Sequence, residues 1–153
     1  MSGVELDTVT EQDVHHVATH MRDADRREVW AAANVKPHFS ISRSVANSEY
    51  SRVVRYDGEP CAIFGVACYK HAGSPWLLGT NLVLTRPRQF LQLGIPAVAH
   101  MLSLRPFLMN FVHTDNHASK RWLLRLGFVI DPAARYGVEG ERFHRFTMER
   151  PDV

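Results

Sequence analysis

Apolar and polar residues follow one another along the N-terminal third in patterns typical of short strands and helices. Residues 4–9 alternate between the two classes, as a half-buried strand does. Thr10, with Asp13 three residues later, resembles a capping box and predicts a helix start. Asp25 is expected to cap a second helix, and residues 40–48 to form a short third one. The predicted first helix has its apolar face at Val14, Val17, Ala18 and Met21.

The middle of the chain is rich in strand-forming residues. Residues 52–56 and 61–69 flank Asp57-Gly58-Glu59-Pro60, and this pattern predicts a β-hairpin because Asp-Gly tolerates the positive φ angles of a tight turn. Residues 76–84 are apolar enough to form a third strand of this group, which is the fourth strand of the chain. Consecutive strands of this kind favour antiparallel pairing.

The remaining pattern predicts a strand between two helices and a final strand. Thr85 is expected to cap a helix that runs to Leu104, with Pro96 kinking or splitting it. Residues 107–113 form an apolar run typical of a buried strand, and residues 118–126 have the spacing of an amphipathic helix. The alternation of residues 142–149 indicates a last strand.

The expected element order is β-α-α-β-β-β-α-β-α-β-β, which predicts an α/β (α+β) fold with a mixed, mostly antiparallel sheet and helices on both faces. No linker or repeat divides the 153 residues, so a single domain, 1–153, is expected. The composition, 45% apolar and 22% charged, is that of an ordinary globular protein. The net charge of +2 is too small to indicate a nucleic-acid-binding protein by itself.

Targeting signals and reactive groups are sparse. The acidic N-terminus is unlike a signal peptide, and no apolar run approaches the roughly 20 residues that span a bilayer, so no membrane partner is expected. Cys61 and Cys68 are interpreted as reduced thiols. His16 and His20 have metal-ligand spacing, but no further ligand is evident, and no metal site is predicted.

The element order, together with Asn116 ahead of Gly127-Phe128, resembles the GNAT superfamily of acetyl-CoA-dependent acyltransferases. The resemblance implies that a helix start after the fourth strand holds the cofactor pyrophosphate through Arg/Gln-x-x-Gly-x-Gly/Ala. In the matching stretch only Gly94 fits a motif glycine. Leu91 stands at the Arg/Gln position, and Pro96, which has no N–H, stands at the second small position. The remaining cofactor-binding candidates are Asn116, Arg86, Arg88 and Gln89.

The residues that would perform the chemistry are not recognisable by this resemblance. Leu123 stands where many GNAT proteins have the tyrosine that protonates the departing thiolate, and a leucine transfers no proton. Residues 76–84 contain no Glu, Asp or His to act as a base. No catalytic residue is therefore predicted, and Asn116 is interpreted as a turn and capping residue.

A narrower resemblance concerns residues 55–65, 75–81, 109–128 and 143–148, which are similar to the internal virion protein A family of short-tailed phages. That family is itself GNAT-like. The resemblance implies a non-catalytic component of a tailed-phage virion, in the internal, head or head–tail region, with other virion proteins as partners and no cofactor. It also implies a location in the virion, and in the host cytoplasm during assembly.

Two alternatives remain open. The first is an acetyl-CoA-dependent N-acyltransferase with a degenerate cofactor loop. The second concerns the basic residues, which are either solubilising charge or contacts to packaged DNA. These residues are Arg22, Arg26, Arg27, Lys120, Arg121 and Arg125. For a virion component, large apolar residues at element ends are candidate assembly contacts, namely Trp30, Phe39, Trp76 and Phe90.

Overall fold

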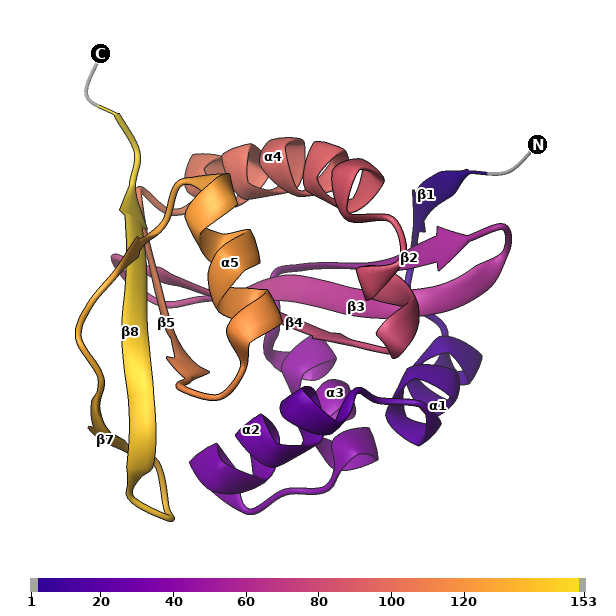
Figure 1. The fold of residues 1–153 in the computed structure, drawn as a ribbon. Helices are drawn as coiled ribbons and strands as arrows, with labels where there is room; N and C mark the ends of the chain where they lie inside the picture. The colour runs from indigo at the N-terminus through magenta and orange to yellow at the C-terminus, as the bar shows by residue number, and fades with distance from the viewer. Residues whose placement is uncertain (1–2, 152–153) are drawn as a thin grey trace.

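The computed structural model describes residues 3–151, which form five α-helices, one 3₁₀ turn and eight strands (Figure 1). The helices are α1 (Glu11–Thr19), α2 (Asp23–Ala33), α3 (Pro37–Asn47), α4 (Pro87–Leu104) and α5 (His117–Leu126), and the 3₁₀ turn is η1 (Asn81–Leu84). The strands are β1 (Val4–Asp7), β2 (Tyr50–Tyr56), β3 (Glu59–Cys68), β4 (Gly73–Gly79), β5 (Phe107–His113), β6 (Val129–Ile130), β7 (Ala134–Tyr136) and β8 (Glu141–Glu149).

The strands form a single sheet in the order β1-β2-β3-β4-β5-β8-β6, with β7 also paired to β8. Every pair is antiparallel except β4–β5, which is parallel. This parallel pair has one register position, Gly73 opposite Leu108, so the two strands separate toward their carboxyl ends. The mixed, mostly antiparallel sheet predicted from the sequence is confirmed.

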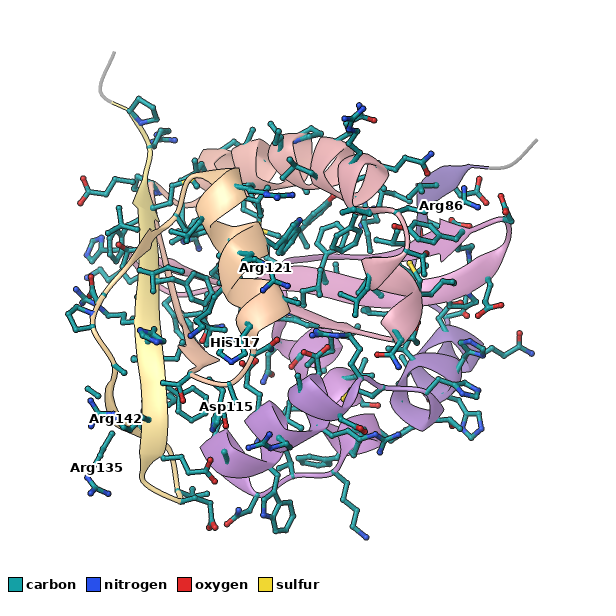
Figure 2. All side chains as sticks on the ribbon, viewed as in Figure 1. Arg86, Asp115, His117, Arg121, Arg135 and Arg142 are labelled. Atoms are coloured by element: carbon teal, nitrogen blue, oxygen red, sulfur yellow. The ribbon has the colours of Figure 1, made fainter. Side chains whose placement is uncertain are left out.

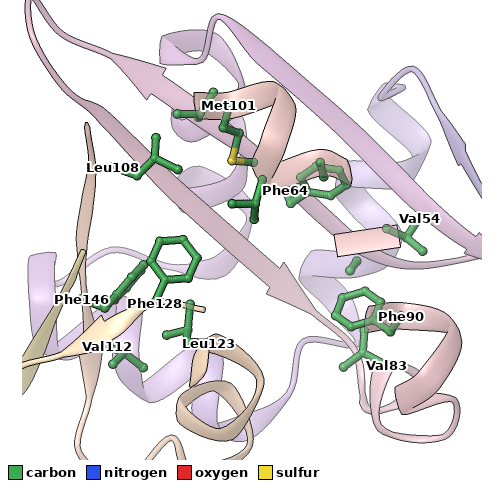
Figure 3. Packing of buried hydrophobic residues seen from close by; sticks show 14 of the residues in the cluster. Val54, Phe64, Val83, Phe90, Met101, Leu108, Val112, Leu123, Phe128 and Phe146 are labelled. Carbon is green, nitrogen blue, oxygen red and sulfur yellow. The ribbon is translucent and has the colours of Figure 1, made fainter. Parts of the chain in front are cut away.

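Helices cover both faces of the sheet, α4 and α5 on one side and α1, α2 and α3 on the other (Figure 1). The alternation of strand residues assigns each apolar side chain to one face. Val53 and Ile63 pack with Val17 of α1, whereas Val54 and Phe64 pack on the opposite side. Figure 3 shows this second cluster, in which residues of α4 and α5 meet the sheet, including Phe90, Met101, Leu108, Leu123 and Phe146.

Several predicted boundaries are correct. The Thr10–Asp13 capping box is present, because the Asp13 amide donates to the Thr10 hydroxyl and the Thr10 amide donates to the Asp13 carboxylate. The hairpin turns at Asp57, which has a positive φ of 51°. The predicted strand over residues 107–113 is β5, and Gly127 ends α5 in the left-handed conformation with φ of 103°.

Three predicted element boundaries are wrong for identifiable reasons. The strand expected over 76–84 ends at Gly79, because the Thr80 hydroxyl accepts from the Leu82 amide and caps η1. Thr85 does not cap α4, whose N-cap position is Arg86. Pro96 does not split α4, since it lies on the exposed side of the helix, where the carbonyl that it leaves unpaired is near water.

Asp25 does not cap α2 but lies inside it, buried, and joins the helix to the sheet. Its Oδ1 accepts from Nη1 of Arg22 at 3.0 Å, and its Oδ2 accepts from the Gly79 amide at 2.9 Å. The Arg22 amide in turn donates to the Gly79 carbonyl at 2.8 Å. Burial raises the pKa of Asp25, and the Arg22 guanidinium counteracts this effect. The carboxylate therefore holds the start of α2 against the end of β4.

The helix α5 offers a matched pair of leucines to test the core. Leu123 is 7% exposed and packs in the core, whereas its neighbour Leu124 is 58% exposed. Leu123→Ala should lower the free energy of unfolding by about 2–5 kcal/mol because it leaves a cavity. Leu124→Ala should change it by less than about 0.5 kcal/mol. Urea melts of both variants measure the difference, and equal losses would contradict this packing.

A second matched pair tests the buried ion pair. Asp25→Ala leaves the Arg22 guanidinium buried without a carboxylate and should cost about 3–5 kcal/mol. Asp115→Ala removes only the surface partner of Arg27 and should cost less than about 1 kcal/mol. Thermal and urea unfolding of the two variants provide the comparison. A loss below about 1 kcal/mol for Asp25→Ala would show that Asp25 does not anchor α2.

Candidate functional site at the opening between β4 and β5

The separation of β4 and β5 leaves a cavity that passes between the two layers of helices. It encloses about 210 Å³ and is lined by residues of both strands, of α2 and α3 on one face, and of α4 and α5 on the other. One hydrogen bond crosses the opening, from Nδ2 of Asn110 to the Pro75 carbonyl at 2.7 Å. The cavity therefore gives a ligand access to the middle of the sheet, where backbone groups of β4 and β5 are not paired with each other.

A buried polar network closes one end of this opening. Asn116, which is 1% exposed, accepts from Nη2 of Arg22 at 3.2 Å and donates from Nδ2 to Asp25 at 3.2 Å. The same amide donates to Glu28 at 3.3 Å. Asn116 occupies the N-cap position of α5, as expected, but its side chain makes no capping hydrogen bond. The interpretation of its side chain as a cap is wrong, because the three charged residues of α2 and its N-cap engage it instead.

Glu28 is the group in this network that faces the cavity. Its Oε1 accepts from the His113 amide at 2.8 Å as well as from Asn116. No hydrogen bond of the described residues reaches Oε2. Burial, and then the negative charge of Asp25, raise the pKa of Glu28 to about 7. A partly buried carboxyl group with one free oxygen and this pKa can accept a proton near neutral pH.

A second cavity, of about 330 Å³, lies between the start of α4 and the side of α5. Three arginines contribute to its lining, namely Arg22, Arg121 and Arg125. Arg121 extends from the outer side of α5 in Figure 2. The two cavities share four lining residues, Leu77, Phe90, Ser119 and Trp122. An apolar opening and a basic depression therefore lie next to each other.

Trp122 stands at the shared wall with an unsatisfied donor. Its ring stacks on Phe90 with centroids 5.0 Å apart. Its Nε1 is buried and has no hydrogen-bond partner in the described chain. Buried indole N–H groups usually have an acceptor, so this atom is suited to a ligand carbonyl at the junction of the two cavities.

Arg88, Gln89 and Gly94, which the sequence indicates as candidates for cofactor binding, do not line the basic depression. Arg88 and Gln89 are exposed in the first turn of α4, and the described lining of both cavities omits them. Gly94 lies well inside α4, where a Cβ would meet Trp122 and Leu126 at 3.0 Å. Its role is the close approach of α4 to α5. The helix thus begins at Pro87, before the stretch that resembles the phosphate motif.

Other groups considered from the sequence contribute nothing to this site. Among residues 3–151 there is no group of three or more potential metal ligands around His16 and His20. Both thiols are free, and burial raises the pKa of Cys61 to about 12, which makes it a poor nucleophile. Arg26 donates to carbonyls at the end of α1. None of the helices in the described part is both long and apolar enough to span a bilayer.

Glu28 lies outside residues 76–84, the segment in which the resemblance implies a base. The signal available in the sequence was the spacing of Asp25, Glu28 and Ala32, which places two carboxylates on a helix face that should be apolar. The expectation that Asp25 caps the helix hides this face, because a cap lies outside the helical turns. The sequence offered no means of pairing Glu28 with His113, 85 positions away.

Comparison with solved structures identifies the fold. The structure is similar to an N-acetyltransferase from Staphylococcus aureus Mu50, with a TM-score of 0.71, 11% identity, and coverage of 97% of this chain and 99% of that one. It is similar to spermidine N-acetyltransferase from Vibrio cholerae in complex with CoA and spermine, with a TM-score of 0.70, 12% identity, and coverage of 96% and 95%. A Bacillus subtilis acetyltransferase in complex with CoA gives a TM-score of 0.67, 9% identity, and coverage of 99% and 100%.

No family model and no curated protein matches the sequence. The comparisons therefore give no support to the internal virion protein family. The expectation of a non-catalytic virion component is wrong because the similar structures are acetyltransferases, and the expectation of no cofactor is not supported, since some of them are complexes with CoA. The similar structures are acetyltransferases and include complexes with CoA, which favours the acyltransferase alternative instead. The chain has the GNAT acetyltransferase fold.

Proposed function

We propose that this protein is an N-acetyltransferase that transfers the acetyl group of acetyl-CoA to a primary amine, with Glu28 as the general base. The observation that carries the proposal is the Glu28 carboxyl group, with a pKa near 7 and a free Oε2, at the opening between β4 and β5. Acetyl transfer to an amine needs such a base, because an amine attacks only after its ammonium form has lost a proton.

The two adjacent cavities fit the parts of acetyl-CoA. The basic depression beside Arg121 and Arg125 suits phosphate groups, since guanidinium groups form charge-assisted hydrogen bonds to them. The apolar opening suits the pantetheine arm, whose amide carbonyls are acceptors for the unpaired Nε1 of Trp122. Pro87 at the start of α4 supplies no N–H to a phosphate. Phosphate binding therefore depends more on the side chains of α5 than on backbone N–H groups of α4.

Bound acetyl-CoA supplies a thioester: the amine nitrogen forms a bond to the acetyl carbon, the carbon–sulfur bond breaks, and the thiolate leaves. Glu28 removes a proton from the amine through Oε2 while Oε1 stays bonded to the His113 amide and to Asn116. Burial, and then the Asp25 carboxylate, keep the pKa of Glu28 high enough for this role.

Leu123 occupies the position at which a tyrosine would protonate the thiolate, and it packs in the core. The departing sulfur is therefore not protonated by α5 at that position. A thiol has a pKa near 8.5, so its anion is a fair leaving group near neutral pH without a dedicated acid. The chemistry thus rests on the base and on the position of the amine.

Removing the two arginines that α5 contributes to the basic depression should weaken the binding of acetyl-CoA. The double variant Arg121→Ala/Arg125→Ala should raise the dissociation constant of acetyl-CoA about 10-fold or more, since each charge-assisted hydrogen bond contributes roughly 1.5–3 kcal/mol. Arg88→Ala is the matched control on the exposed side of α4 and should change it less than about threefold. Titration calorimetry measures both constants. A stronger effect of Arg88→Ala would place the phosphates at the start of α4 instead.

Replacing the base should remove the pH dependence of the reaction. In the wild-type protein, kcat/KM should be low while Glu28 is protonated and should rise through an apparent pKa near 7. Glu28→Gln should lower kcat by about 10²–10⁴-fold and abolish that limb of the profile. Glu11→Gln, on the exposed side of α1, is the control and should behave as wild type.

The profile is measured by following free thiol released from acetyl-CoA in the presence of a panel of primary amines. Acetyl transfer that persists at the wild-type rate in Glu28→Gln would contradict the assignment of the base. Absence of both acetyl-CoA binding and acetyl transfer in the wild-type protein would contradict the proposed function.

A further inference from the structure

The cavity continues past Glu28 into a compartment on the α2–α3 side of the sheet. Its walls come from two helices of this layer and two central strands of the sheet: Val29 and Ala32 of α2, Ser40 and Ser44 of α3, Trp76 of β4, and Phe111 of β5. Tyr136 of β7 completes the lining. We call this part, beyond Glu28 on the α2–α3 side, the aromatic compartment.

Stacked rings give the aromatic compartment a fixed wall. Phe111 and Tyr136 lie parallel, with centroids 3.8 Å apart and planes inclined by 14°. Tyr136 also meets Phe143 edge to face at 5.2 Å. On the other side, Nε1 of Trp76 donates to the Ser48 hydroxyl at 2.7 Å, which fixes that ring. Aromatic side chains held in this way favour contact with another planar apolar group.

The lining of the cavity is almost free of charge. Glu28 is the one charged residue among those that the described chain places around the cavity. A single carboxylate can pair with one ammonium group. A second ammonium group on the acceptor would have no carboxylate partner there, and an acceptor carboxylate or phosphate would have no cation.

We propose that the acceptor is a monoamine whose remaining part is an uncharged aromatic ring on a short aliphatic chain. The inference rests on the proposed acetyl transfer for its chemistry, but the recognition itself is a binding property. The amine lies at Oε2 of Glu28, and the ring lies in the aromatic compartment against Phe111 and Tyr136. Polyamines, amino acids and phosphorylated amines are then poor ligands.

Equilibrium binding to the full chain tests this class with three probes. 2-Phenylethylamine, ethylamine and spermidine are titrated by calorimetry at pH 8, where Glu28 is ionised. 2-Phenylethylamine should bind roughly 30-fold or more tightly than ethylamine, because the phenyl ring leaves water for an apolar wall. It should also bind more tightly than spermidine.

Variants of the aromatic compartment test where the phenyl ring of 2-phenylethylamine binds. Tyr136 is 38% exposed, so Tyr136→Ala is expected to fold, and it should reduce the preference for 2-phenylethylamine over ethylamine at least threefold. Phe111→Leu keeps an apolar strand residue and should reduce the preference in the same direction. Phe39→Ala, on the exposed side of α3, is the control and should retain it. Circular dichroism verifies folding of each variant.

The outcomes separate this inference from the proposed function. Preferential binding of 2-phenylethylamine that depends on Tyr136 supports the acceptor class, even if no acetyl transfer follows and the proposed function fails. Binding of spermidine or ethylamine as tight as that of 2-phenylethylamine overturns the acceptor class, even if those amines are acetylated. A preference that Tyr136→Ala and Phe111→Leu both leave unchanged also overturns it.

Discussion

The site depends on the hydrogen bonds that join α2 to the carboxyl ends of β4 and β5, where these two strands are no longer paired with each other. Arg22 and Asp25 bind Gly79 at the end of β4, while Glu28 binds the amide of His113 at the end of β5. Because β4 and β5 pair at one register position, the helix bridges the strands where the sheet does not. The bridge keeps the opening in place and brings carboxylates into a buried region.

The same bridge explains the acid–base property of Glu28. Asp25 lies one turn earlier on α2, and its negative charge, added to burial, disfavours ionisation of Glu28. Asn116 donates to both carboxylates and so fixes their relative position. In this structure, the carboxyl group that lines the opening comes from α2, a helix in the layer opposite α4 and α5, and not from β4.

Local patterns in the sequence predicted much of the fold, and long-range ones predicted little of the site. The Thr10–Asp13 box, the strand 107–113 and the Gly127 stop depend on neighbouring residues and were correct. Glu28 accepts hydrogen bonds from His113 and Asn116, which no local pattern connects to it. Gly94, the residue that fits a glycine of the phosphate motif, instead allows α4 to pack on Trp122.

The proposed acetyl transfer requires a carboxyl group of raised pKa at the opening between β4 and β5. The direct measurement is a titration of the Glu28 side-chain carboxyl carbon by nuclear magnetic resonance in ¹³C-labelled protein, with Glu28→Gln to assign the signal. The account predicts a midpoint near pH 7. A midpoint near pH 4.5, the ordinary value for a glutamate, would contradict it.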